Sequence, residues 1–314
     1  MWNVINPPEH GSYYSAGRYS TSPRQTRCID MSAVTGLTVF CDNRSIYGIH
    51  AHRTDETATS TYRSLYSAYQ HTVMWRYFPF EPQEMITRAW VHENSGFADG
   101  TILVVRTQEH CCWLQRLTST KIHTSRDRRC FFGACPERER ASYQVLCDVS
   151  MKHLLYDEPA LGGAITWFGA TPMPSLLSQT SPEEDGSDPD FHYTHASLLC
   201  VDQAEIYYDD HGASTGVLFS YSDGSSESIG QRRVGLSTTK ITQVHLPSRI
   251  HLRTFEIKTH DHRMLPCRRK CVEVQFTCGN SELLFKEWHS QDMVGTVTWL
   301  FTLRKDIVQL SREP

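Results

Sequence analysis

Residues 216–235 read GVLFSYSDGSSESIGQRRVG, and this stretch decides the predicted fold. Apolar and small side chains alternate through residues 217–222 with the two-residue period of a β-strand. Asp223-Gly224 follows as a two-residue turn, and both residue types tolerate the positive φ angles of a type I′ hairpin turn. We therefore predict a β-hairpin here.

The turn also sets the expected pairing of the two strands. The return strand is predicted over residues 225–229 and ends at Gly230. A two-residue loop places Leu218 opposite Ile229, so that the apolar ends of the strands meet on one face. Weaker versions of this pattern recur along the chain, which favours an architecture of paired strands.

Strand patterns separated by turn residues run through most of the sequence. They fall at residues 37–41, 46–49, 85–91, 101–107, 130–135, 143–147, 162–169, 198–201, 204–208, 250–258, 271–277, 283–285 and 294–303. Residues 60–70 show little alternation and are expected to form a short helix or a lid-like excursion. The series predicts an all-β protein with little helix, built as a jacalin-like β-prism or as sandwich or barrel halves.

The composition divides the chain into four segments. Residues 1–27 contain several Pro and Gly and are expected to form an extended N-terminal arm. Residues 28–172 form the first predicted β domain. Residues 173–190 are rich in Pro, Ser and acidic residues and are expected to be a linker or a surface loop. Residues 191–314 form a second β-rich half packed on the first.

Composition limits the classes of protein that this chain can be. It has 314 residues and a net charge of −4 with His neutral, so no overall charge draws it to nucleic acid. Its 11 Cys include no pair of CxxC motifs, which favours reduced thiols. The N-terminus lacks the features of a secretory signal, and no apolar stretch approaches the ~18 residues of a membrane span. We expect a cytoplasmic protein without a membrane partner, and the sequence leaves a homo-oligomer open.

The motifs of the common enzyme classes are absent from the sequence. It contains no nucleophile elbow with a Ser-His-Asp order, no HExxH, no P-loop and no dinucleotide-binding fingerprint. Hydrolase, protease, kinase and dehydrogenase activities therefore lack support. An enzyme built on this chain is expected to need no cofactor, and to act through a shaped apolar pocket and a few hydrogen-bond donors.

The order of several segments resembles the jacalin-like β-prism family. The segments that carry this resemblance are PFEPQEMITRAWV at 79–91, TILVVRT at 101–107, CFFGAC at 130–135 and GGAITWFG at 162–169. The resemblance covers residues 30–172 and, more loosely, 196–303, and it implies three Greek-key sheets around a pseudo-threefold axis. The chain also resembles filamentous-fungal proteins that share a GIHAH strand, here at 48–52, and an ESIGQ hairpin, here at 227–231.

Two functions of different classes follow from this resemblance. The family's usual activity is carbohydrate binding, by a terminal loop that places an Asp a few residues after a Gly. The matching residues 169–173, GATPM, contain no Asp, and Asp306 in the second half has no accompanying Gly. This departure favours a cofactor-free cyclase, isomerase or cycloaddition enzyme of fungal secondary metabolism, acting on a hydrophobic small molecule. The alternative is a lectin that binds a glycan without catalysis.

Five residues are the candidates for catalysis. His50, His52 and Arg106 lie on strands predicted to be central, and each could polarise a carbonyl or enone group. Tyr208 and Asp209, just before the decisive hairpin, combine a phenol with a carboxylate and could complete an acid–base set.

Flat aromatic side chains are the candidates for substrate binding. Trp90, Trp167 and Tyr221 lie on predicted strands and could form the walls of an apolar pocket. Histidines two residues apart share a strand face, but spacing places no third ligand, so no metal is expected. The basic runs at 126–140 and 263–270 are interpreted as solvated loops rather than nucleic-acid contacts.

Overall fold

The computed structural model is almost wholly β, as predicted. It describes residues 14–17, 25–42, 45–53, 58–65, 70, 72–81, 84–92, 102–108, 127–132, 143–159, 163–172, 192–236, 239–260, 266–279, 287–302 and 304–312. These residues contain 21 strands, the helix α1 (Thr59–Ser64) and a single 3-10 turn, η1 (Met31–Ala33). Helix α1 overlaps the first part of the segment 60–70, where a short helix is one of the two expectations. None of the described helices has the length and hydropathy that a membrane span requires.

The first half, residues 14–172, contains three antiparallel sheets. Their strand orders are β1-β11-β10-β2, β4-β3-β5 and β8-β7-β6-β9. The strands are β1 (Tyr14–Gly17), β2 (Thr26–Asp30), β3 (Gly36–Cys41), β4 (Ile46–His52), β5 (Met74–Pro79), β6 (Met85–His92), β7 (Ile102–Gln108), β8 (Asp127–Phe132), β9 (Tyr143–Cys147), β10 (His153–Asp157) and β11 (Trp167–Thr171).

The second half, residues 192–312, contains three further antiparallel sheets. Their strand orders are β12-β20-β21, β15-β14-β13-β16 and β18-β17-β19. The strands are β12 (His192–Ser197), β13 (Val201–Tyr208), β14 (Ser214–Tyr221), β15 (Ser226–Gly230), β16 (Lys240–His245), β17 (Arg249–His260), β18 (Pro266–Thr277), β19 (His289–Asp292), β20 (Thr296–Phe301) and β21 (Asp306–Ser311).

The decisive hairpin is present as β14 and β15, but its predicted register is wrong. Val217, and not Leu218, lies opposite Ile229. Gly224 has a φ of +87°, whereas Asp223 is not among the residues with positive φ. A type I′ turn needs positive φ at both positions, so the chain forms a three-residue loop with Gly in the left-handed position instead. The longer loop shifts the pairing by one residue.

Other differences from the predicted boundaries have local causes. Tyr14–Gly17 pairs with β11, and β2 begins at Thr26, so these parts of the expected N-terminal arm belong to a sheet. Residues 198–200 are not part of a strand: residues 199 and 200 form a turn, in which Cys200 adopts a φ of 59° between β12 and β13. The expected strand at 283–285 and the linker at 173–190 lie outside the described residues.

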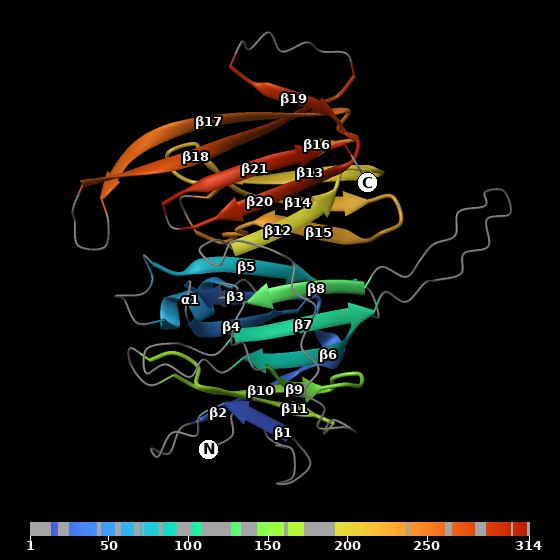
Figure 1. The fold of residues 1–314 in the computed structure, drawn as a ribbon, viewed down its shortest axis with the longest axis vertical. Coiled ribbons are helices and arrows are strands. Elements are labelled where there is room, and N and C mark those ends of the chain that lie inside the picture. Colours follow the sequence, from blue (N-terminus) through green and yellow to red (C-terminus); the bar gives the residue numbers. More distant parts are fainter. Residues whose placement is uncertain are drawn as a thin grey trace, which may run out of the picture.

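The two halves stack along the long axis of the molecule and share buried contacts (Figure 1). Strand β5 of the first half lies beside the second half, and its residue Met74 packs into the apolar core there. Trp75 N–H donates to the side-chain oxygen of Gln231, 3.3 Å away, and the Arg76 side chain donates to Tyr193 O at 3.0 Å. Edge strand β5 thereby joins two otherwise separate cores.

Candidate functional site

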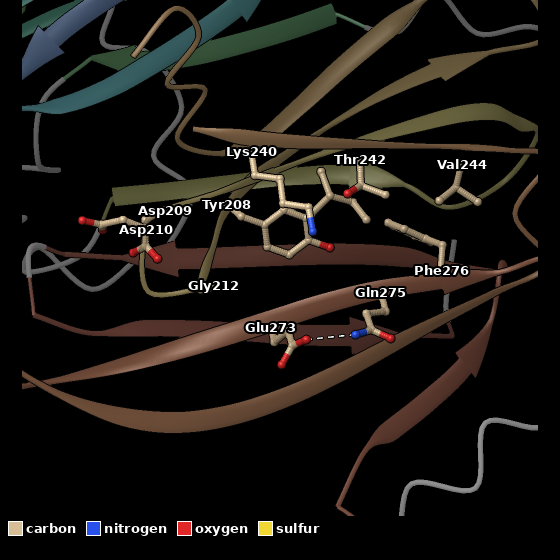
Figure 2. A pocket seen from close by; sticks show the side chains of 11 residues that line it. Tyr208, Asp209, Asp210, Gly212, Lys240, Thr242, Val244, Glu273, Gln275 and Phe276 are labelled. Carbon is tan, nitrogen blue, oxygen red and sulfur yellow. Dashed lines mark hydrogen bonds between the residues drawn. The ribbon is translucent and has the colours of Figure 1, made fainter. Parts of the chain in front are cut away.

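A groove between strands β16 and β18 is the candidate functional site. Its volume is about 630 Å³, within the ~300–1,000 Å³ that is usual for small-molecule sites. Figure 2 shows side chains from both walls facing this space. The groove is lined by Ile206, Tyr208, Asp209, Asp210, Gly212, Lys240, Thr242, Val244, Glu273, Gln275 and Phe276.

One wall follows from the pairing of β13 with β16. Tyr208 lies opposite Lys240, and Ile206 lies opposite Thr242. Paired residues in adjacent strands point to the same face of a sheet, so these four side chains line one surface. Strand β16 is the last strand of its sheet, and the surface therefore ends at an open edge.

A β-bulge lies at the end of this wall, where β13 pairs with β14. Tyr207 lies opposite Gly216 and Tyr208 lies opposite Ser214, so Thr215 is an extra residue on β14. Gly216 is required here, because a Cβ atom on it would stand 2.5 Å from the backbone oxygen of Gln231. Bulges bend the strand that carries the extra residue, and Ser214, just before Thr215 on β14, accepts a hydrogen bond from Val274 N–H of β18.

The floor of the groove is tied together by the phenol of Tyr208. Its hydroxyl donates to Val274 O, 3.0 Å away, and Val274 N–H donates to Ser214 Oγ at 2.9 Å. Burial, and next the charge of Glu273, raise the pKa of Tyr208 to about 12. The phenol is therefore protonated at neutral pH, and its hydroxyl is occupied while its ring borders the groove.

The opposite wall carries an amide and a carboxylate from β18. Gln275 donates from Nε2 to Glu273 Oε1 at 2.9 Å, as the dashed line in Figure 2 marks. The guanidinium of Arg253 pairs with the other oxygen of Glu273. The hydrogen bond holds Gln275 through its amide nitrogen, and its amide oxygen takes no part in it. Phe276 supplies an apolar surface at the same wall.

Asp209 closes one end of the groove and is held by several donors. Its Oδ1 accepts backbone N–H groups of His211 and Ala213, at 3.0 and 2.9 Å. Its Oδ2 lies 3.3 Å from Arg269 Nη1. Two backbone donors and one guanidinium thus hold both oxygens of the Asp209 carboxylate in place at this end of the groove.

The same arginine connects the groove to a buried acid. Arg269 Nη2 lies 3.2 Å from Asp306 Oδ2, and Trp299 Nε1 donates to Asp306 Oδ1 at 3.2 Å. Burial raises the pKa of Asp306 from its ordinary value, while Arg269 opposes this shift. Asp306 is only 1% exposed, so its carboxylate is enclosed by protein donors and is not presented to an outside ligand.

The structure separates the predicted catalytic residues. Tyr208 and Asp209 line the groove, and the other three do not. His50 and His52 share a face of β4, as their spacing predicts, with ring centroids 4.7 Å apart. Both are buried in the first half. His50 Nδ1 is 2.9 Å from Thr61 Oγ1, and His52 Nε2 is 2.7 Å from the hydroxyl of another threonine.

The remaining predicted residues also lie outside the groove. Arg106 of β7 lies opposite Arg88 of β6. Trp90 is 2% exposed, and the Arg88 guanidinium lies 5.9 Å from its ring centroid. Trp167 lies on β11 of the first half. Tyr221 is buried, and its hydroxyl donates to Ser197 O at 2.8 Å. The catalytic role of Arg106 and the substrate-binding roles of the three aromatic residues stay predictions.

Sequence reasoning missed the groove residues on β16 and β18. Residues 240–245, KITQVH, alternate between the two faces of a strand, but the alternation mixes Lys and Thr with Val and carries little apolar signal. Glu273 and Gln275 lie on a strand that was predicted correctly, and no local pattern marks them as groove residues. Only the fold brings the two strands together.

The described residues contain no group of three or more His, Cys, Asp or Glu arranged to hold a metal ion. Sequence comparison likewise assigns the chain to no known family. No family model matches it, and no curated protein is significantly similar to it. The chemistry of the groove is thus the observation on which a function can be built.

Proposed function

We propose that this protein binds a carbohydrate in the β16–β18 groove and does so without catalysing a reaction. The observation that carries this proposal is the combination of an aromatic ring, an amide, a hydroxyl and charged groups around one open space. A sugar presents C–H groups on one face and hydroxyls around its edge. Such a ligand can pack on the ring of Tyr208 while its hydroxyls bond to Thr242 and Gln275.

The fold supports the same proposal. Each half contains three antiparallel sheets, and three sheets are what a jacalin-like β-prism implies. The proposed site differs from the loop that such lectins use, because Asp306 is enclosed by Arg269 and Trp299. The groove uses the open side of the second half instead.

The groove favours binding over the cofactor-free cyclase or isomerase. A catalytic site needs a donor or base that is free to act on the substrate. The Tyr208 hydroxyl donates to Val274 O, and Asp209 is ion-paired with Arg269. The catalytic roles of His50, His52 and Arg106 remain predictions for a different place in the molecule.

A glycan array tests this proposal with two groove variants and one control. Thr242→Val removes a hydroxyl at nearly constant volume, and Gln275→Ala removes the amide. The control, Thr254→Val, makes the same threonine-to-valine change at an exposed residue of β17 that lies outside the groove. Loss of one neutral hydrogen bond costs about 0.5–1.5 kcal/mol, so each groove variant should weaken the best neutral glycan about 2- to 12-fold. Silence of the wild type on the array, or equal binding by all three variants, would show that the groove is not a carbohydrate site.

A further inference from the structure

One exposed face of the β17–β18 hairpin carries cations placed directly opposite one another. Lys258 of β17 lies opposite Arg268 of β18. At the edge of β18 that faces away from β17, Lys270 forms an isolated backbone β-bridge with Lys305. In this bridge, Lys270 N–H donates to the backbone oxygen of Arg304 at 3.0 Å. Bridged residues point to the same side of the strands, so the cations of each pair are neighbours. We call Lys258, Arg268, Lys270 and Lys305 the basic strip.

A single acid lies beside the basic strip among the described residues of this face. Glu256 lies opposite Lys270, and its Oε2 is 3.6 Å from Arg268 Nη1. The Arg268 and Glu256 side chains are 76% and 59% exposed, so the pair is largely solvated. Four cations and one anion leave an excess of positive charge, although the whole chain has a net charge of −4. Figure 1 shows that this hairpin extends beyond the other strands of the second half.

This arrangement opposes the stability of the isolated chain. Like charges directly opposite one another destabilise a strand pair, whereas opposite charges stabilise it by roughly 0.2–1 kcal/mol. The favourable rule holds elsewhere in the hairpin, because Glu256 lies opposite Lys270, and Arg253 lies opposite Glu273 and pairs with it. A bound polyanion would remove the repulsion in both cation pairs and would release its own counterions.

We propose that the basic strip binds an acidic polysaccharide, one that carries carboxylate or sulfate groups. This inference rests on the proposed function, because β18 forms both the strip and one wall of the groove. A single solvated anion would gain little from exposed lysines, whereas a linear polymer can contact several of them at once.

Nucleic acid fits the same charges less well. Single-stranded nucleic acids are held by stacking their bases on aromatic side chains as well as by phosphate contacts. The described residues of this face around the strip, 254, 256, 258, 268 and 270, include no aromatic residue. The face therefore offers charge to a polymer but no platform for bases.

The test measures binding of a fluorescent sulfated oligosaccharide and an oligouronate to the full chain at several salt concentrations. The double variant Lys270→Gln/Lys305→Gln should lower the slope of log affinity against log salt by about one to two. Lys152→Gln, which removes an exposed cation from the first half, serves as the matched control and should leave the slope unchanged. Thermal unfolding of Lys258→Gln adds a second readout, because relief of repulsion should leave the midpoint equal or raise it.

The outcomes separate this inference from the proposed function. Strip variants should leave the neutral glycan found by the array bound as before, whereas Thr242→Val should weaken that glycan. The proposed role of the strip would be wrong if the Lys152→Gln control lost as much oligosaccharide binding as the double variant. It would also be wrong if single-stranded DNA of equal charge bound more tightly than the acidic oligosaccharide. Both proposed sites are supported if the groove variants lose the neutral glycan but still bind the acidic oligosaccharides with the same salt dependence as the wild type.

Discussion

The hydroxyl of Tyr208 donates a hydrogen bond to the backbone oxygen of Val274, 3.0 Å away, and thereby joins two sheets beneath the groove. Strand β18 is an edge strand, and its backbone groups at this point face away from its partner β17. The Tyr208 hydroxyl donates to Val274 O, and the Ser214 hydroxyl oxygen accepts from Val274 N–H, so both backbone groups have a side-chain partner. An unpaired buried carbonyl is costly, so this contact closes the floor at the place where the backbone would otherwise be exposed.

Tyr208→Phe should therefore destabilise the protein while leaving the groove open. The variant keeps the ring and leaves Val274 O without its donor, which we expect to cost about 1–3 kcal/mol in the free energy of unfolding. Urea denaturation measures this change at constant m-value. A variant as stable as the wild type would show that the contact does not close the floor.

The two glycines of the decisive hairpin should respond differently to substitution. Gly230 has a φ of +69°, and a Cβ atom on it would stand 2.5 Å from Thr215 O. Gly224 has a φ of +87° with nothing within 4 Å of that atom. Gly224→Ala should cost about 1–2 kcal/mol for the left-handed backbone alone, and Gly230→Ala should cost clearly more. Equal losses in chemical denaturation would contradict the close approach at Gly230.

Arg232 should couple the two halves. Its Cζ atom lies 4.4 Å from the ring centroid of Tyr77 in the first half, and its Nε donates to Tyr207 OH at 2.9 Å. A double-mutant cycle with Tyr77→Leu and Arg232→Gln should give a coupling energy of about 0.5–2 kcal/mol. Additive effects of the two changes would mean that the stacked contact contributes nothing.

His192 should make stability fall in acid. Burial, and next the charge of Arg76, lower the pKa of His192 well below its ordinary value of 6.5. The unfolded chain gains this proton as the pH falls through about 6.5, whereas the folded chain does not. The free energy of unfolding should then decrease by up to about 1.4 kcal/mol per pH unit from this group.

The variant His192→Phe isolates that contribution. Its stability should change less between pH 7 and pH 5.5 than that of the wild type. His195→Gln removes an exposed histidine of the same strand and should behave as the wild type does. An unchanged pH profile in His192→Phe would contradict a neutral buried imidazole.

The sequence predicts local strands well because their signals are local. The alternation at residues 217–222 and the β-branched run at 101–107 both correspond to strands. The register of the hairpin was missed because Asp-Gly suits two loop lengths, and the residue types do not decide between them. Among the three loop residues 222–224, Gly224 is the one with a positive φ.

The site was predicted only where it adjoins the hairpin. Tyr208 and Asp209 were noticed as a polar set at the end of a strand, and both line the groove. Lys240 and Gln275 reach the same groove from strands far apart in the sequence, and their neighbourhood depends on how the sheets pack. His50 and His52 show the converse, because a clear local pattern led to buried side chains bonded to threonines.

The position of a bound glycan decides whether the β16–β18 groove is the carbohydrate site. Hydrogen–deuterium exchange is measured on the full chain with and without a saturating amount of the best glycan from the array. We expect slower exchange in residues 240–245 and 273–276, which form the two walls of the groove. Protection confined to residues 304–306, or to the first half, would contradict it.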